Sequence, residues 1–202
     1  MPAAVRATWT DLTVEHHGVG LFRGFSYGAP DGMLIGVVGP SSPALTVALR
    51  ALAGRYSPLR GTVDIAGGPA SVALVTSSEA DPLVRVREAV GEVSRVPQGS
   101  TGRAFVEWSL NAAGLSEVGD RLVGDLTAAE EVRLGLALAA SAGATMIVLD
   151  VSAVAADASA PELMVLLRQL ANGGRLVIVG APAAHDAMDL VLPVPAPLEV
   201  LS

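Results

Sequence analysis

Short apolar runs that alternate with helical patterns constrain the fold of this chain most. Residues 33–39 (MLIGVVG), 145–150 (TMIVLD) and 175–180 (RLVIVG) are rich in apolar residues and too short to be helices of their own. Runs of this kind are typical of strands buried on both faces of a sheet. Helical spacing follows the first two runs, at residues 44–54 and 161–174. The alternation predicts an α/β fold with a mostly parallel sheet flanked by helices, whose ligand crevice lies at the carboxyl ends of the strands.

The remaining segments favour a single domain over residues 1–202. Further strands are predicted at 8–18, 57–68 and 71–77. Residues 82–125 form an inserted, mostly helical lobe in this interpretation, and 96–102 is its most loop-like stretch. The proline-rich end from residue 189 onward predicts an edge strand or a tail.

Composition narrows the class of partner. The chain has 20 acidic residues against 13 basic ones, all of which are arginine, and a formal net charge of −7. Nucleic acids and anionic membrane surfaces bind basic patches, so we expect neither as the main partner. No cysteine is present, which excludes disulfides and thiol chemistry. The N-terminal residues lack the apolar core of a signal peptide, so a cytoplasmic location is expected.

Residues 39–46 (GPSSPALT) connect the first buried run to its helix, where a phosphate-binding loop would lie. The candidate phosphate contacts are Gly39, Ser41, Ser42, Thr46 and Val47. Together with its flanks and the segments described below, the loop resembles that of the ATP-binding-cassette (ABC) nucleotide-binding domain family, and the resemblance covers about residues 10–192. It implies a P-loop NTPase-like (ABC ATPase-like) fold with a small inserted helical lobe.

Four substitutions distinguish this loop from the family's Gly-Pro-Asn-Gly-x-Gly-Lys-Ser. Ser42 and Ala44 replace glycines, and Pro43 removes a backbone N–H. Leu45 replaces the lysine that reaches the β- and γ-phosphates in the family. A strand-turn-helix connection with small residues for close packing would explain the same stretch without a ligand. In a further alternative, Pro43 and Leu45 close the loop as an apolar plug.

Residues 126–141 (LTAAEEVRLGLALAAS) resemble the family's signature Leu-Ser-Gly-Gly-Gln/Glu and the helix that follows it. The signature-like residues are Leu126, Thr127, Ala128, Ala129 and Glu130. Both signature glycines are alanines here, and each methyl would crowd the approach of a partner subunit's γ-phosphate that the resemblance implies. Thr127 and Glu130 also form a capping-box pattern, and a simple N-cap is the plainer interpretation of Thr127.

Residues 145–157 resemble the family's strand that ends in a Mg²⁺-supporting aspartate, followed by a catalytic glutamate and a loop ending in aspartate. Asp150 and Asp157 are kept, but Val151 stands in the glutamate's place and cannot accept a proton from water. We therefore expect no catalytic residue. No metal site is expected either, except that Thr46 and Asp150 would hold Mg²⁺ if Mg-ATP binds. A turn or helix-cap role for Asp150 is equally open.

Three more family positions are altered or ambiguous. Ser77 stands where the family places a glutamine that senses Mg²⁺ and the membrane partner. The place of the family's switch histidine falls on Pro182, and His185 lies three residues later. We interpret His185 as a surface histidine, with a lengthened switch loop as the alternative. His16 and His17 lie near the family's adenine-stacking position, although a solvated turn is the plainer interpretation.

The sequence thus predicts a catalytically inactive ABC-ATPase-like protein that acts through protein–protein contacts. Its partner would be a second copy, an active ABC ATPase or a membrane transporter component, which would make it peripheral to the membrane at most. No cofactor is expected. The alternatives are a nucleotide-binding module that does not hydrolyse ATP and the ATP-binding subunit of an ABC transporter, and both would bring ATP and Mg²⁺ to the loop.

Overall fold

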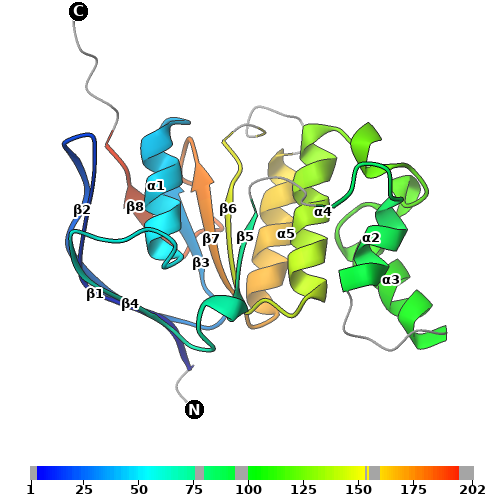
Figure 1. Ribbon diagram of the computed structural model, residues 1–202, viewed down its shortest axis with the longest axis horizontal. Coiled ribbons are helices and arrows are strands. Elements are labelled where there is room, and N and C mark those ends of the chain that lie inside the picture. The colour runs from blue at the N-terminus through cyan, green and yellow to red at the C-terminus, as the bar shows by residue number, and fades with distance from the viewer. Residues whose placement is uncertain (1–3, 76–79, 94–99, 153, 155–159, 196–202) are drawn as a thin grey trace, which may run out of the picture.

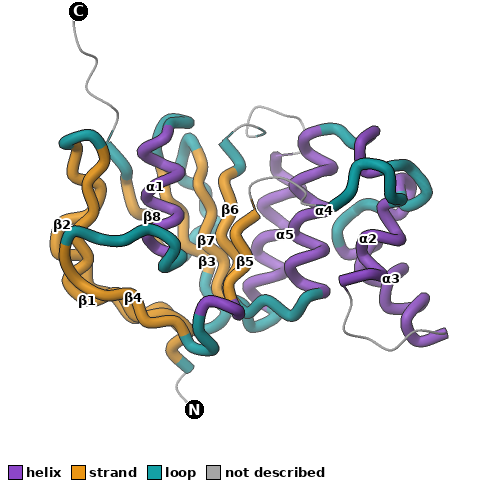
Figure 2. The backbone as a smooth tube through the Cα atoms, viewed as in Figure 1, coloured by secondary structure: helices purple, strands orange, loops and turns teal. Residues whose placement is uncertain are grey.

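A five-stranded, wholly parallel sheet forms the centre of the molecule (Figures 1 and 2). The computed structural model describes residues 4–75, 80–93, 100–152, 154 and 160–195. In spatial order the strands are β5 (Val72–Val75), β6 (Met146–Asp150), β7 (Leu176–Ala181), β3 (Leu34–Val38) and β8 (Leu190–Pro193). The predicted α/β class with a mostly parallel sheet is confirmed. Strand β8 lies at the sheet edge, so of the edge strand or tail predicted for the proline-rich end, residues 190–193 form the edge strand.

Helices cover both faces of this sheet. Helix α1 (Pro43–Leu52) packs on one face, while α4 (Ala128–Ser141) and α5 (Ala160–Asn172) pack on the other (Figure 1). Successive residues of a strand point to opposite faces, so Ile178 joins the core under α1 and its neighbour Val177 joins the core under α5. This explains why the central strands are apolar at every position.

A separate three-stranded antiparallel sheet packs beside α1. It comprises β2 (Val19–Pro30), β1 (Val5–His16) and β4 (Arg60–Ile65), in that spatial order. Trp9 of β1 is 1 % exposed, and its indole N–H donates to the Leu52 carbonyl at the end of α1, 3.1 Å away. Our sequence analysis assigned no strand to residues 19–30. That segment interleaves glycines and polar residues, and it is a strand because it pairs along β1.

The turn between β1 and β2 accounts for the two adjacent histidines. His16 pairs with Val19, which leaves His17 and Gly18 as a two-residue turn, and both have positive φ values, 48° and 77°. Positive φ at both central residues is typical of the tight hairpin turns that match strand twist. The structure thus places His17 in a hairpin turn, the plainer of the two interpretations.

The segment predicted to be an inserted helical lobe contains α2 (Val86–Val93), α3 (Ser100–Ala112) and two short 3-10 turns. Its apolar residues form a third cluster that also includes Leu134 and Ala137 of α4. Residues 100–102 belong to α3, so the predicted loop at 96–102 is wrong for that part, and 96–99 lie outside the described residues. Among the described helices, none is both long and apolar enough to cross a membrane.

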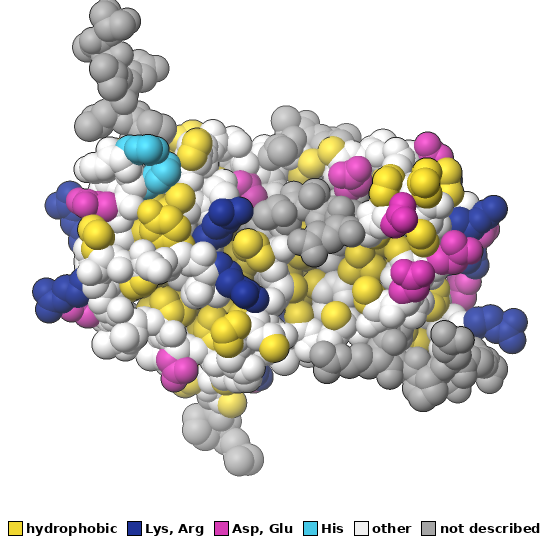
Figure 3. Space-filling model, viewed as in Figure 1, with side chains coloured by type: hydrophobic (Ala, Val, Ile, Leu, Met, Phe, Trp, Pro, Cys, Tyr) yellow, Lys and Arg dark blue, Asp and Glu magenta, His cyan; other side chains and the backbone are white. Residues whose placement is uncertain are grey.

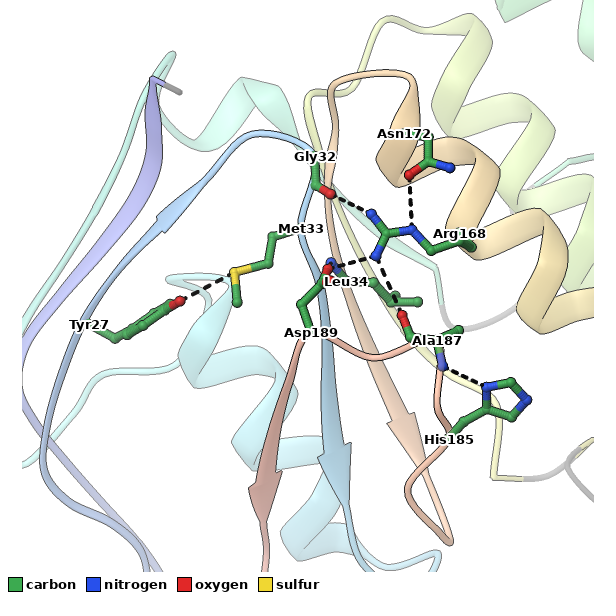
Figure 4. A network of polar contacts seen from close by, with 9 residues as sticks. All are labelled: Tyr27, Gly32, Met33, Leu34, Arg168, Asn172, His185, Ala187 and Asp189. Carbon is green, nitrogen blue, oxygen red and sulfur yellow. Dashed lines mark hydrogen bonds and ion pairs between the residues drawn. The ribbon is translucent and has the colours of Figure 1, made fainter. Parts of the chain in front are cut away.

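A polar network fastens α5 to the beginning of β3 and β8 (Figure 4). The Arg168 guanidinium on α5 donates to the Asp189 carboxylate at 2.7 Å and to the Gly32 carbonyl at 2.7 Å. The same Asp189 oxygen accepts the backbone N–H of Leu34 at 2.8 Å. One carboxylate therefore joins a helix to the first residue of a central strand.

These bonds set the charge state of Asp189. Partial burial by itself would raise its pKa, but the Leu34 N–H and the Arg168 guanidinium stabilise the charged form more, so the pKa is lowered. Its stabilising contribution is fully present above the pKa of the unfolded chain. The contribution is lost as the pH falls through the lowered folded value.

We predict that Asp189→Asn lowers the free energy of unfolding by about 1 kcal/mol at pH 7, because a half-exposed ion pair contributes little more than that. The difference from the parent chain should shrink below about pH 4, as Asp189 becomes protonated. Urea unfolding between pH 3 and 8 measures it. Asp186→Asn, an exposed acid in the same connection, is the control. An unchanged difference down to pH 3 would contradict the role given to this carboxylate.

Candidate functional site

The predicted phosphate loop and the strand-ending acid meet at the carboxyl edge of the parallel sheet. The loop runs from Gly39, directly after β3, to Ser42, directly before α1. Asp150 is the last residue of β6. Figure 1 shows the start of α1 and the ends of β6 and β7 at the same, upper edge of the molecule. This is the edge at which parallel α/β sheets place their ligands.

Gly39 anchors the loop against the sheet. Its N–H donates to the Ala181 carbonyl at the end of β7, 3.1 Å away. A methyl group on Gly39 would lie 3.0 Å from the Val194 carbonyl oxygen. Glycine therefore serves close packing at this position.

Ser42 is the N-cap of α1. Its hydroxyl accepts the Leu45 N–H at 3.3 Å, and its carbonyl is 3.5 Å from the Thr46 hydroxyl, which donates to it. Pro43, the first helical residue, carries no N–H. The backbone groups that bind anions at a helix N-terminus are its free N–H groups. Here one of them is absent and another is occupied by the chain's own cap.

Leu45 lies in the apolar core. Its side chain is 0 % exposed and belongs to the cluster under α1. It packs beside Gly180 of β7, where an added methyl would lie 3.4 Å from two Leu45 carbons and 2.8 Å from Leu49. The side chain at the family's lysine position therefore points into the core. Burial on this scale stabilises the helix by about 1.5–3 kcal/mol.

Asp150 is engaged by its own turn. The Ser152 N–H and hydroxyl both bind one oxygen of its carboxylate, at 2.9 Å and 2.5 Å. The Ser152 Oγ also lies 3.0 Å from the Ser41 Oγ of the loop. Hydrogen bonds from a residue two positions on are typical of an aspartate that stabilises a turn. In this structure the phosphate loop and the acid are thus joined through Ser152, which our sequence analysis did not single out.

Val151, in the place of the family's catalytic glutamate, is 4 % exposed. Its side chain belongs to the core cluster beneath α5, and its N–H donates to the Gly180 carbonyl at 2.9 Å. An apolar, buried side chain at this position offers no group that could take a proton. Asp157 and Ser77 lie outside the described residues.

The signature-like segment forms the start of α4. The Thr127 hydroxyl accepts the Glu130 N–H, and the Glu130 carboxylate accepts the Thr127 N–H at 2.8 Å, which confirms the predicted capping box. The Thr127 N–H, with Arg121 beside the carboxylate, lowers the pKa of Glu130 although partial burial opposes the shift. Leu126 and Ala129 are buried, and Ala128 is exposed. Figure 1 shows this segment at the same edge as the loop, with β5 and β6 between them.

The switch region contains an exposed His185. Its Nδ1 accepts the Ala187 N–H at 3.0 Å, so one of its two ring nitrogens is engaged by its own turn (Figure 4). Pro182 is exposed in the same connection between β7 and β8. Among the described residues, no three His, Asp or Glu side chains form a group that could hold a metal ion.

A wide groove lies between α1 on one side and α2 and α4 on the other. Its volume is about 830 Å³, and β5, α2 and α4 supply its apolar walls. Charged residues of both signs border it: Arg50, Arg55, Asp81 and Glu92. Figure 3 shows basic side chains near the middle of this face, with apolar side chains beside them. Val75 and Ala80, the last described residue before Ser77 and the first after it, line this groove.

The packing of Leu45 gives a stability prediction. Leu45→Ala should lower the free energy of unfolding by about 2–5 kcal/mol, because it leaves a cavity in the core beneath α1. Leu59→Ala, at a leucine that is 69 % exposed, should change it by less than about 0.5 kcal/mol. Chemical denaturation of both variants measures the difference. Equal effects would show that Leu45 does not pack as described.

The chain is similar to ATP-binding proteins of transport systems. It is 32 % identical over 170 residues to the cytochrome c biogenesis ATP-binding export protein CcmA of Roseobacter denitrificans, covering 83 % of this chain and 80 % of that protein. It is 28 % identical over 194 residues to the cobalamin import ATP-binding protein BtuD of Halobacterium salinarum, covering 88 % of this chain and 48 % of that protein. No protein-family model matches the chain.

Solved structures share the fold of this chain. The structure of cbiO1 from Clostridium perfringens, described as part of the ABC transporter complex cbiONQ, matches with a TM-score of 0.72 at 16 % identity, covering 95 % of this chain and 87 % of that one. Because the relatives are ATP-binding proteins of export and import systems, they support the transporter-subunit alternative better than an inactive regulatory role. The chain belongs to the ABC transporter ATP-binding domain family.

Proposed function

We propose that this chain takes the place of the ATP-binding subunit in a membrane transporter, and that its own phosphate loop does not turn ATP over. The transporter part follows the relatives, whose names describe ATP-binding proteins of export and import. It replaces a purely regulatory role as our leading hypothesis. The second part depends on the loop itself and is a departure from what those names imply.

The observation that carries the second part is the burial of Leu45. A buried leucine supplies no positive charge to a β- or γ-phosphate, and the chain contains no lysine that could substitute for it. Pro43 and the Ser42 cap leave fewer free N–H groups for the same phosphates. The loop residues therefore fit a triphosphate poorly.

The residue at the family's catalytic-base position offers no proton acceptor for an attacking water. Val151 is apolar and buried, and one oxygen of the Asp150 carboxylate accepts the N–H and the hydroxyl of Ser152. Loss of a general base or of a charge-stabilising group each costs on the order of 10²-fold in rate. With both missing, turnover would fall far below that of an ordinary member of the family.

The groove between α1, β5, α2 and α4 is where we place the membrane component. Its lining includes Val75 and Ala80, which lie in the sequence on either side of the position at which the family resemblance implies a membrane partner. Its apolar walls with charged rims suit an amphipathic helical segment. A cytoplasmic chain that docks on a membrane protein through this groove needs no membrane-spanning helix of its own. A second copy of this chain and an active ABC ATPase remain the alternative partners.

An ATP turnover assay tests the loop. We predict no phosphate release from Mg-ATP above that of Thr46→Ala, because this chain has neither the lysine nor the base. Thr62→Ala, at an exposed threonine of β4, is the control for a threonine substitution outside the loop. Steady turnover that Thr46→Ala or Asp150→Asn abolishes would overturn the proposal and identify an ordinary ATPase. Calorimetric titration with ATP alongside separates binding from hydrolysis.

Photo-crosslinking in cells of the source organism tests the groove. Val93, 38 % exposed, lines the groove, and Val165, 57 % exposed, lies on α5 outside its lining. With p-benzoylphenylalanine at either position, we expect a crosslink to a multi-spanning membrane protein from position 93 at least tenfold stronger than from position 165. A crosslink to a second copy, or equal yields from both positions, would contradict docking of a membrane protein here.

A further inference from the structure

A second cavity lies between α3, α4 and α5. Its volume is about 210 Å³ and its lining is mostly apolar. It shares no lining residue with the groove between α1, α2 and α4, and none of the phosphate-loop residues lines it. A ligand in this cavity would therefore meet neither a nucleotide at the loop nor a partner in the groove.

The cavity has a buried floor and an open mouth. Leu136 and Ala137 of α4 and Leu166 of α5 are 9 % exposed or less, and they form the floor. Trp108, which is 65 % exposed, and Ala112, which is also exposed, belong to α3 and form the mouth. A small molecule can thus enter from solvent and bury most of its surface against the three helices.

Small side chains create the space. Four of the lining residues are alanines: Ala112, Ala113, Ala137 and Ala140. A cavity of roughly 150 Å³ lined by apolar side chains accommodates benzene in a protein core. The cavity between α3, α4 and α5 is somewhat larger, so it has room for a benzene ring with one or two methyl-sized substituents.

The hydroxyl groups in the lining are not available to a ligand. The Oγ atoms of Ser109 and Ser141 are buried and have no hydrogen-bond partner within the described part of the chain. Charge enters the lining with Arg175, which is half-buried and donates its Nε–H to the Ala144 carbonyl at 3.2 Å. A ligand hydroxyl that reached the floor would meet leucine and alanine side chains and lose its water without gaining a partner, which disfavours binding.

Two aromatic side chains of α3 lie together in the lining. The ring centroids of Phe105 and Trp108 are 5.9 Å apart, and the rings are tilted by 37°. Aromatic rings prefer such tilted or offset arrangements to a face-to-face sandwich. An aromatic ligand can therefore pack beside this pair, while the leucine and alanine side chains of the floor enclose its other end.

From the volume, the apolar floor and the aromatic pair we infer that this cavity binds an uncharged, monocyclic aromatic molecule with small apolar substituents. The ring lies between the three helices, and its burial against apolar side chains supplies the affinity. A carboxylate would lose more hydration than the half-buried Arg175 could restore, because a solvent-screened charge contributes little. The cavity therefore selects an uncharged ligand although an arginine lines it.

Calorimetric titration of the full chain with p-xylene, hydroquinone and 4-methylbenzoate tests the inference. Hydroquinone carries a hydroxyl in place of each methyl group of p-xylene, so one hydroxyl faces the floor in either orientation of the ring. We expect saturable binding of p-xylene and at least about tenfold weaker binding of the other two compounds. Equal affinity for p-xylene and hydroquinone, or tighter binding of 4-methylbenzoate, would overturn the inference.

Matched variants locate the binding. Ala112 and Ala104 are both exposed alanines of α3, and of the two Ala112 lines the cavity. Ala112→Leu narrows the mouth and should raise the Kd of p-xylene at least about tenfold, whereas Ala104→Leu should leave it unchanged. Ala140→Leu fills the cavity from α4 and should have the same effect as Ala112→Leu, so it replaces that variant if Ala112→Leu fails to fold.

Two further results would contradict a site between these helices. The first is the absence of saturable binding up to the solubility limit of p-xylene. The second is binding that Ala112→Leu and Ala104→Leu weaken equally, which indicates adsorption elsewhere on the molecule.

Discussion

The contact between α1 and the strand face of β3 and β7 is the constraint on which the rest of the structure depends. Leu45 and Leu49 pack against Gly180, whose missing side chain lets the helix approach the sheet closely. The same helix receives Trp9 from the antiparallel sheet at its other end. One helix therefore joins both sheets into a common core, and its first turn is at the same time the predicted phosphate loop.

Because of this double role, the residues of the loop also determine how α1 packs on the sheet. A lysine at position 45 would have to reach out of the core toward a ligand, whereas leucine remains inside and adds apolar contact. Ser42 caps the helix where an anion would otherwise satisfy the free N–H groups. The residues that replace the family's loop residues thus stabilise the strand-turn-helix unit.

Helices α2 and α3 share their apolar core with α4. Helix α2 borders the wide groove with charged rims, and α3 borders the smaller, mostly apolar cavity. The groove is open and large enough for a helix of a partner, and the cavity holds at most a small molecule. Both share α4, which also carries the signature-like capping box at its start.

The sequence by itself determined the α/β class, the central strands and the capping box of α4, because apolar runs and Thr127 with Glu130 act through local or strongly periodic patterns. It also placed Leu45 at the family's lysine position. It could not reveal β2, because glycine-rich residues 19–30 become a strand only by pairing with β1. Nor could it reveal the link from Ser41 through Ser152 to Asp150, or the unpaired Ser109 and Ser141. Those contacts join residues distant in the chain, so only the tertiary structure decided them.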